Sequence, residues 1–252
     1  MPKKIQKKKR CQSHPFPLTT FERKDLNSWT FYTADIHQLT VVVKDKDEAD
    51  AMHEMGSFGT WADDDTMNIE GASAKDTTTK KFIMTYEEAF FLSFALGCLF
   101  ISYESKEIDI SEQWNLFCSK KKRFPVTYAV YHHFRTKGWV PKEGLKFGTD
   151  YILYKHGPSY THAAYAVIIQ EVNDDLTNSD RSSRHLTWTS MAGLGRLVSS
   201  VSKSLLICSI TSTNIDTSSP NCLKQMNIYE TVFSRWMSSK EQEDELDVDT
   251  VF

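Results

Sequence analysis

The chain has 252 residues and a formal net charge of −3, and 40% of its residues are hydrophobic. This is enough for one or two domains with a buried core. The longest apolar run, at 89–101, is shorter than the ~20 residues that cross a bilayer, so we expect no membrane partner. The five cysteines are widely spaced without a C-x-x-C pair, which argues against a disulfide framework and a zinc site.

The charge is distributed unevenly between the two ends of the chain. The first ten residues carry six basic side chains, whereas the segment 241–249 is almost wholly acidic. The basic run is typical of a nuclear-targeting signal, a nonspecific RNA-binding arm or a solvated tail, and these alternatives stay open. The acidic end is typical of a solubilising tail. We therefore expect a basic flexible tail over 1–28 and an acidic tail over 241–252.

A small α/β domain is predicted over 29–123. An apolar strand is expected at 38–45, followed by a helix at 47–56 that stops at a glycine. The polar, turn-rich segment 62–81 predicts a surface loop.

The strongest helix signal of this domain begins with a capping box. Thr85 and Glu88 have the spacing at which each side chain satisfies a free backbone N–H at a helix start. The apolar run 89–101 then predicts a buried helix that ends near Gly97. A second short helix is expected at 111–118.

A second domain is predicted over 124–240. It begins with a helix that runs from Pro125 to Gly138, since proline favours the first turn and glycine the end. After a turn at 138–144, we expect strands at 150–155, 165–172, 204–210 and 226–236, a loop at 173–185, and a helix at 188–199 with Met191, Leu194, Leu197 and Val198 on one face. The predicted fold class is mixed α/β, with a C-terminal mixed sheet.

Three residues of the second domain stand where chain segments meet the rim of this sheet. Tyr154 ends one predicted strand and His162 opens the next, with a tight turn at Gly157 and Pro158 between them. Lys203 stands where a helix gives way to a strand. Each residue alone has an ordinary structural explanation, namely packing for the tyrosine and solvation for the other two. The spacing of the three residues does not by itself distinguish a catalytic role from these structural roles.

Residues 131–169 together with 188–208 resemble the catalytic domain of the tRNA-splicing endonuclease subunits. The shared pattern is Y-x-x-F-R-x-K-G-W, then G-L-K-F-G-x-D-x-x-x-Y, then H-A-x-Y, then R-x6-K-x-L-L. Residues 138–150 and 234–239 are most similar to the catalytic subunit that cuts the 5′ splice site. The resemblance extends over 80–240 and implies the fold of the tRNA-intron endonucleases for the second domain.

The resemblance implies a metal-independent RNA cleavage without any cofactor. Tyr154 would take the proton from the 2′-hydroxyl or orient that group, and His162 as imidazolium would protonate the leaving 5′-oxygen. Lys203 would stabilise the charge that develops on phosphorus. The products would be a 2′,3′-cyclic phosphate and a 5′-hydroxyl. Because an ordinary tyrosine has a pKa near ~10, the choice between base and orienting group stays open.

The resemblance also implies an RNA-binding pair, Arg196 and Trp236, which would hold a flanking base by cation–π and stacking contact. Such stacking contributes ~1–3 kcal/mol per base. Core packing for Trp236 and simple solvation for Arg196 are the structural alternatives. The implied partners are intron-containing pre-tRNA and the other subunits of a nuclear heterotetramer, which are a structural partner and a second catalytic pair.

Two other functions are compatible with parts of the sequence. A metal-dependent nuclease needs carboxylates that hold the metal, usually with one of them two residues before a lysine. The residue two before Lys155 is Leu153, so Asp150 lacks the second carboxylate of that pattern. A non-catalytic subunit of the same RNA-processing complex would be expected to lack part of the trio, which this chain keeps. The remaining candidate ligands fit no standard metal site: His132, His133, His156 and His185.

Overall fold

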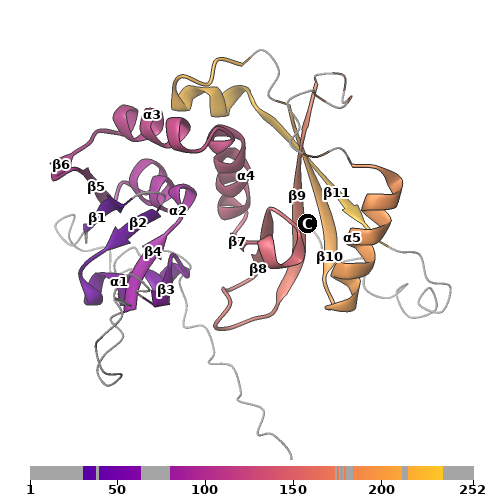
Figure 1. Ribbon diagram of the computed structural model, residues 1–252, viewed down its shortest axis with the longest axis horizontal. Helices are drawn as coiled ribbons and strands as arrows, with labels where there is room; N and C mark the ends of the chain where they lie inside the picture. Colours follow the sequence, from indigo (N-terminus) through magenta and orange to yellow (C-terminus); the bar gives the residue numbers. More distant parts are fainter. Residues whose placement is uncertain are drawn as a thin grey trace, which may run out of the picture.

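The computed structural model describes residues 31–37, 40–63, 80–173, 186–211 and 215–234, with residues 175, 177, 179 and 184. Over these residues the chain forms two mixed sheets with helices between them and on the outer face of the second (Figure 1). The predicted mixed α/β class is confirmed. The tails predicted over 1–28 and 241–252, and most of the loop predicted at 62–81, lie outside the described residues.

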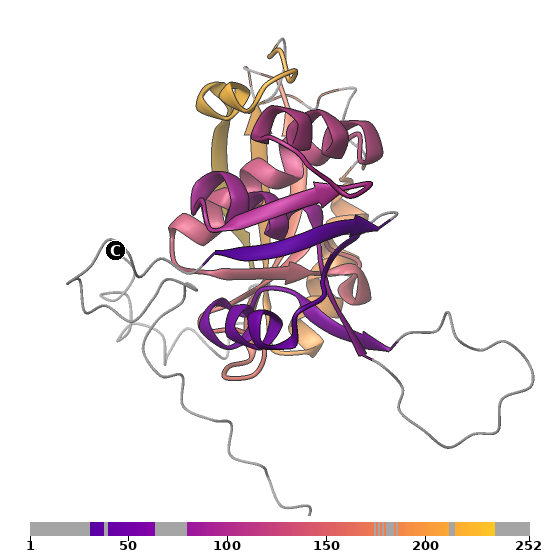
Figure 2. The same cartoon turned by 90° about the vertical axis from the view of Figure 1, so that its left-hand side faces the viewer.

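The first sheet is built by the N-terminal part of the chain and faces the viewer in Figure 2. Its six strands have the order β3-β4-β2-β1-β5-β6, in which β1 and β5 are parallel and the other neighbours antiparallel. The elements are β1 (Tyr32–His37), β2 (Thr40–Val43), α1 (Lys46–Gly56), β3 (Thr60–Asp63), β4 (Lys80–Met84), β5 (Leu99–Tyr103) and β6 (Lys106–Glu107). Helix α1 ends at Ser57, which adopts a left-handed conformation.

The helices between the two sheets follow the predicted capping signals. The capping box of Thr85 and Glu88 is confirmed at the start of α2. The helical path ends before Gly97, whose φ of +64° favours glycine. The predicted end of the helix near Gly97 is therefore confirmed, and the rest of the apolar run belongs to β5. The elements are α2 (Tyr86–Phe90), the π-helical turn η3 (Phe91–Ala95), α3 (Ile110–Lys120) and α4 (Phe124–Thr136).

Aromatic side chains of these helices form the centre of the main core. The buried ring of Phe90 lies 4.8 Å from that of Tyr128 and 5.3 Å from that of Trp114, measured between ring centroids. The same core continues to the inner faces of both sheets, where Val41 and Ile169 are buried. Because one core serves both sheets, the position of one sheet depends on the other.

The second sheet carries the predicted site and has the order β11-β10-β9-β8-β7. Strands β9 and β10 are parallel, and the other neighbours are antiparallel. The elements are β7 (Val140–Glu143), η4 (Leu145–Phe147), β8 (Tyr151–Tyr154), β9 (Ala163–Val172), α5 (Trp188–Ser200), β10 (Ser204–Thr211), η5 (Pro220–Gln225) and β11 (Asn227–Phe233). Helix α4 lies on its inner side and α5 on its outer side (Figure 1).

Two local predictions for this domain differ from the structure. The expected turn at 138–144 contains β7, in which Pro141 is tolerated because β7 is an edge strand. Leu197 was expected on the buried face of α5, but it is 48% exposed, whereas Val198 is buried. The neighbours Ile152, Ala166 and Leu205 pack with Val198 in the smaller outer core.

A buried polar seam joins the first domain to the second sheet. Lys142 on β7 donates from Nζ to the Glu88 carboxylate at 2.6 Å and to the Gly59 carbonyl at 2.9 Å. Burial alone raises the pKa of Glu88, but the charge and hydrogen bond of Lys142 outweigh it, so this pKa lies below its ordinary value. Arg135 on α4 donates to the Gly56 carbonyl at 2.9 Å and lies over the Phe58 ring. The seam therefore fixes the end of α1 against the second domain.

No helix in the described part of the chain is long and apolar enough to span a membrane. Cys98, Cys118, Cys208 and Cys222 are free thiols, and Cys11 lies outside the described residues.

Candidate active site

The strand directions bring the three predicted catalytic residues to the same edge of the second sheet. Tyr154 is the last residue of β8 and pairs with Ala163, the first residue of the antiparallel β9. His162 immediately precedes β9, and Lys203 immediately precedes β10, which runs parallel to β9. Since neighbouring strands lie ~4.8 Å apart, the three backbone positions lie within about 10 Å of one another across the sheet.

A β-bulge occurs at this edge. Leu153 pairs with Tyr165, whereas the next residue, Tyr154, pairs with Ala163, so Ala164 is an extra residue on β9. Bulges of this kind turn the strand locally and redirect the side chains beside it. The shift falls immediately after the predicted histidine, where it changes the direction from which the chain enters the strand.

Tyr154 is half-buried against the outer core between the sheet and α5. Burial raises the pKa of its hydroxyl above the ordinary value of a tyrosine. A neutral phenol is therefore the state of this side chain at neutral pH. It can orient a ligand hydroxyl by hydrogen bonding, but it is a weaker proton acceptor than a phenolate.

Lys203 is held at the edge by two contacts. Its Nζ lies 4.9 Å from the centroid of the Phe147 ring and donates to the Val201 carbonyl at 3.2 Å. Phe147 belongs to the same outer core as Tyr154, so one aromatic ring positions the lysine beside the core that holds the tyrosine. The predicted trio did not include Phe147. Its signal was the G-L-K-F-G pattern, in which Gly148 has a φ of +66° and ends the turn.

His162 is exposed at the end of a tight turn. Gly157 has a φ of +96°, and its carbonyl accepts hydrogen bonds from the N–H groups of Tyr160 and Thr161. The Thr161 hydroxyl is in turn 3.4 Å from the N–H of His156. These bonds close the turn and leave the imidazole at the surface, within reach of a ligand.

The turn that leads to His162 rests on the first domain. A Cβ atom added to Gly157 would lie 1.9 Å from the Ser57 Oγ at the end of α1. The Tyr160 hydroxyl donates to the Glu54 carbonyl of the same helix at 3.5 Å. The sequence did not predict this contact, because its two sides are 100 residues apart. In the local sequence, this contact is indicated only by the presence of a glycine in the turn.

The segments that carry Tyr154, His162 and Lys203 contain no carboxylate side chain. No aspartate or glutamate occurs in 151–170 or 186–211, whereas Lys155, Arg196 and Lys203 occur there. Lys155 and Arg196 are exposed. The charged side chains of these segments are therefore all basic, although the whole chain has a charge of −3, and basic side chains favour a polyanionic ligand.

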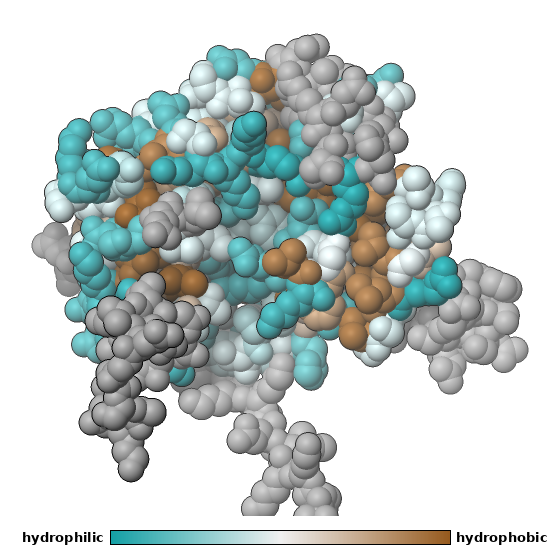
Figure 3. Space-filling model, viewed as in Figure 1, coloured by the Kyte–Doolittle hydropathy of each residue, from teal (hydrophilic) through white to brown (hydrophobic). Residues whose placement is uncertain are grey.

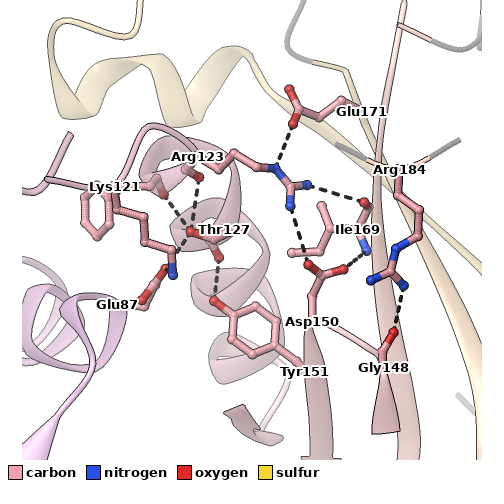
Figure 4. A network of polar contacts seen from close by, with 11 residues as sticks. Glu87, Lys121, Arg123, Thr127, Gly148, Asp150, Tyr151, Ile169, Glu171 and Arg184 are labelled. Atoms are coloured by element: carbon pink, nitrogen blue, oxygen red, sulfur yellow. Dashed lines mark hydrogen bonds and ion pairs between the residues drawn. The ribbon is translucent and has the colours of Figure 1, made fainter. Parts of the chain in front are cut away.

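Asp150, the carboxylate nearest in sequence to β8, is used inside the protein. It accepts from the Ile169 N–H at 2.8 Å and from the Arg123 guanidinium at 3.5 Å, and Arg123 also contacts Glu171 at 3.1 Å (Figure 4). These contacts clamp the start of α4 to β9. In the described ranges no group of three or more His, Cys, Asp or Glu side chains could hold a metal ion.

Of the two residues predicted to bind RNA, Arg196 belongs to the described part of the chain and Trp236 does not. Arg196 is exposed on α5, and its Nε donates to the Ala192 carbonyl at 3.2 Å. Trp236 lies outside the described residues. The pairing of the two stays a prediction.

Comparison with known protein families finds two matches along the chain. The family "tRNA intron endonuclease, catalytic C-terminal domain" matches residues 124–217. The family "tRNA intron endonuclease, N-terminal domain" matches residues 32–114. The two matches together include both sheets except for β11.

Comparison with curated proteins finds similar chains in animals and plants. The tRNA-splicing endonuclease subunit Sen2 of Rattus norvegicus is 45% identical over 166 residues, which make up 64% of this chain and 35% of the rat protein. The Gallus gallus Sen2 protein is 43% identical over 66% of this chain and 36% of its own length. Subunit Sen2-1 of Arabidopsis thaliana is 32% identical over 64% of this chain and 67% of its own length. The aligned region thus spans about a third of the two vertebrate relatives.

Proposed function

Because the chain belongs to the Sen2 family of tRNA-splicing endonuclease subunits, we propose that it cleaves the 5′ splice site of intron-containing pre-tRNA. The observation that carries the proposal is the common edge of Tyr154, His162 and Lys203, in a region without carboxylates. The choice of the 5′ site rests on the resemblance of residues 138–150 and 234–239 to the subunit that cuts there.

The proposed reaction is an attack of the 2′-oxygen on the adjacent phosphorus. A bond forms from the 2′-oxygen to phosphorus while the bond from phosphorus to the 5′-oxygen breaks. His162 as imidazolium gives its proton to the leaving 5′-oxygen, a contribution of roughly 10²- to 10⁴-fold for a positioned acid. Lys203 stabilises the additional negative charge on the phosphoryl oxygens. The products are a 2′,3′-cyclic phosphate and a 5′-hydroxyl, without a metal or cofactor.

Tyr154 has an orienting role in this proposal. Its raised pKa keeps the phenol neutral, so its oxygen accepts a hydrogen bond from the attacking 2′-hydroxyl and aligns it. A solvent water molecule takes the 2′-proton as the 2′-oxygen bonds to phosphorus. Arg196 and Trp236 would hold a base that flanks the cleaved bond.

We further propose that the chain works in a nuclear heterotetramer. The C-terminal strand β11 lies at the edge of the second sheet and exposes Tyr229 and Val232. An edge strand with unpaired backbone groups is suited to adding a strand from another chain. A structural subunit would pair there, and a second catalytic pair would complete the complex. The basic run within residues 1–10 supports nuclear targeting.

The decisive experiment is a cleavage assay on intron-containing pre-tRNA with the reconstituted complex in EDTA, followed by analysis of the product ends. We expect 5′-site cleavage that leaves a cyclic phosphate. A His162→Ala complex should assemble normally and lose at least about 100-fold in 5′-site cleavage rate. Undiminished cutting by that complex would assign the chemistry to another subunit and leave this chain a structural role. Loss of all activity in EDTA would instead favour a metal-dependent nuclease.

A further inference from the structure

One side of helix α5 presents a tryptophan and an arginine in line. Trp188, Ala192 and Arg196 are spaced by four residues and therefore lie on the same side of the helix. Trp188 is 77% exposed, which is unusual for so large an aromatic side chain. The bond from Arg196 Nε to the Ala192 carbonyl folds the arginine toward the tryptophan.

The helix surface between these two side chains carries the small side chain of Ala192, which is partly exposed. The distance along the axis from Trp188 to Arg196 is about 12 Å at 1.5 Å per residue. The helix itself therefore places no bulky side chain between the indole and the guanidinium.

The charge around this surface favours an anionic occupant. Residues 186–211 contain no acidic side chain, and Arg196 and Lys203 are their cations. Helix α5 runs from Trp188 to the turn before Lys203, so its exposed side connects the tryptophan with the candidate active site. Figure 3 shows hydrophobic surface on the side of the molecule where α5 and the second sheet lie in Figure 1. Exposed aromatic rings beside positive charge are what single-stranded nucleic acid binds.

We propose that Trp188 stacks on a nucleobase of the bound RNA, a few nucleotides from the phosphate that is cleaved. The RNA strand then follows α5 from the active-site edge past Arg196 to Trp188. This inference rests on the proposed function and extends it by a second base-binding position. Its contact is with the face of a base, so it tolerates different bases.

Binding measurements on the assembled complex test this position. With the cleavage-inactive His162→Ala complex and unspliced pre-tRNA, Trp188→Ala should raise the Kd about 5- to 150-fold, while Trp188→Phe should retain most of the affinity. Removing a phosphate-binding cation lowers the slope of log affinity against log salt by about 1, whereas loss of a stacking residue leaves that slope unchanged. Trp188→Ala should therefore weaken binding equally at every salt concentration. Phe100→Ala, which removes a 44% exposed aromatic ring from the first sheet, is the matched control and should bind like the parent.

The outcomes separate the two proposals. A Trp188→Ala complex that binds pre-tRNA as tightly as its parent overturns the stacking position, while cleavage by the unaltered complex upholds the proposed function. Loss of subunit assembly in Trp188→Ala, seen by size-exclusion chromatography, would make this residue a protein contact and also overturn the inference. An unaltered complex that neither binds nor cuts pre-tRNA would overturn both. Because Trp188 lies outside the core, the thermal unfolding midpoint should not change.

Discussion

Helix α1 of the first domain and the segments that carry the candidate active site differ in charge. Helix α1 of the first domain carries four acidic side chains between Asp47 and Glu54. The segments 151–170 and 186–211 of the second carry none. An RNA backbone is repelled by the first surface and attracted by the second. This difference supports the proposed RNA-binding role of the second sheet, whereas the first sheet contributes by packing.

The packing contribution of the first domain is specific. It meets the second sheet through the buried pair of Glu88 and Lys142 and through the contact of Ser57 with Gly157. The first contact supports the fold, and the second supports the turn before His162. Substitutions at each contact separately distinguish an effect on the stability of the fold from an effect on the cleavage rate.

The largest loss of stability is expected for Lys142→Met. Removing the ammonium leaves the Glu88 carboxylate buried without its cation, which should lower the free energy of unfolding by about 3–5 kcal/mol. Urea unfolding of the full chain measures this loss. The control is Lys106→Met, since the ion pair of Lys106 with Glu112 is exposed and contributes less than about 1 kcal/mol. Equal losses in both variants would contradict a special role for the seam.

Gly157→Ala should lower the cleavage rate because it displaces the turn that leads to His162. The new methyl group cannot fit beside Ser57, so the turn must shift, and a displacement of about 1 Å near a reacting group can cost about 100-fold in rate. The rate of 5′-site cleavage by the assembled complex measures this effect. Adding Ser57→Gly should restore part of the rate, because it removes the obstructing side chain.

The control for this variant is Gly97→Ala in the first domain. Gly97 also has a positive φ, +64°, but an added Cβ atom meets nothing within 4 Å. It should therefore lower stability through backbone strain of roughly 1–2 kcal/mol and leave cleavage unchanged. If both alanine variants cut at the parent rate, the first domain does not position the turn.

The smallest effect is expected at the outer strand of the second sheet. Glu230 on β11 contacts Lys137 at 2.7 Å and His133 at 2.5 Å, which ties the edge strand to α4. Burial raises the pKa of Glu230, but the hydrogen bonds from Lys137 and His133 outweigh it and lower this pKa below its ordinary value. The stabilisation is therefore complete above the unfolded-state pKa of about 4.3 and is lost as the pH falls through the lower folded-state value.

Urea unfolding at pH 7 and pH 3 of the parent and of Glu230→Gln checks this pH dependence. The parent should be more stable at pH 7 by less than about 1 kcal/mol, and the difference should be smaller at pH 3. A difference that grows toward low pH would contradict the assignment. Compared with Lys142→Met, the small value would show that the seam between the sheets matters more than the tie at the edge.

Local patterns in the sequence were sufficient for several elements. The capping box at Thr85, the glycine after the apolar helix and the periodicity of α5 each depend on residues a few positions apart. Several strands were not predicted, since a short strand, or one with an edge proline, is recognised only when its partner is known. They are β1, β3, β4, β5, β6 and β7. Leu197 was misplaced because an apolar residue at the border of a helix face can lie on either side.

By itself the sequence determined which chemical groups are available: a phenol, an imidazole and an ammonium at the ends of predicted strands, and an acid-free surrounding. Only the tertiary structure decided that these strand ends share one edge, because the pairing of β8, β9 and β10 joins segments far apart in the chain. It also decided which neighbours hold them, Phe147 for Lys203 and Ser57 for the turn before His162. Such contacts follow from the common packing of both sheets on one core, and no local pattern encodes them.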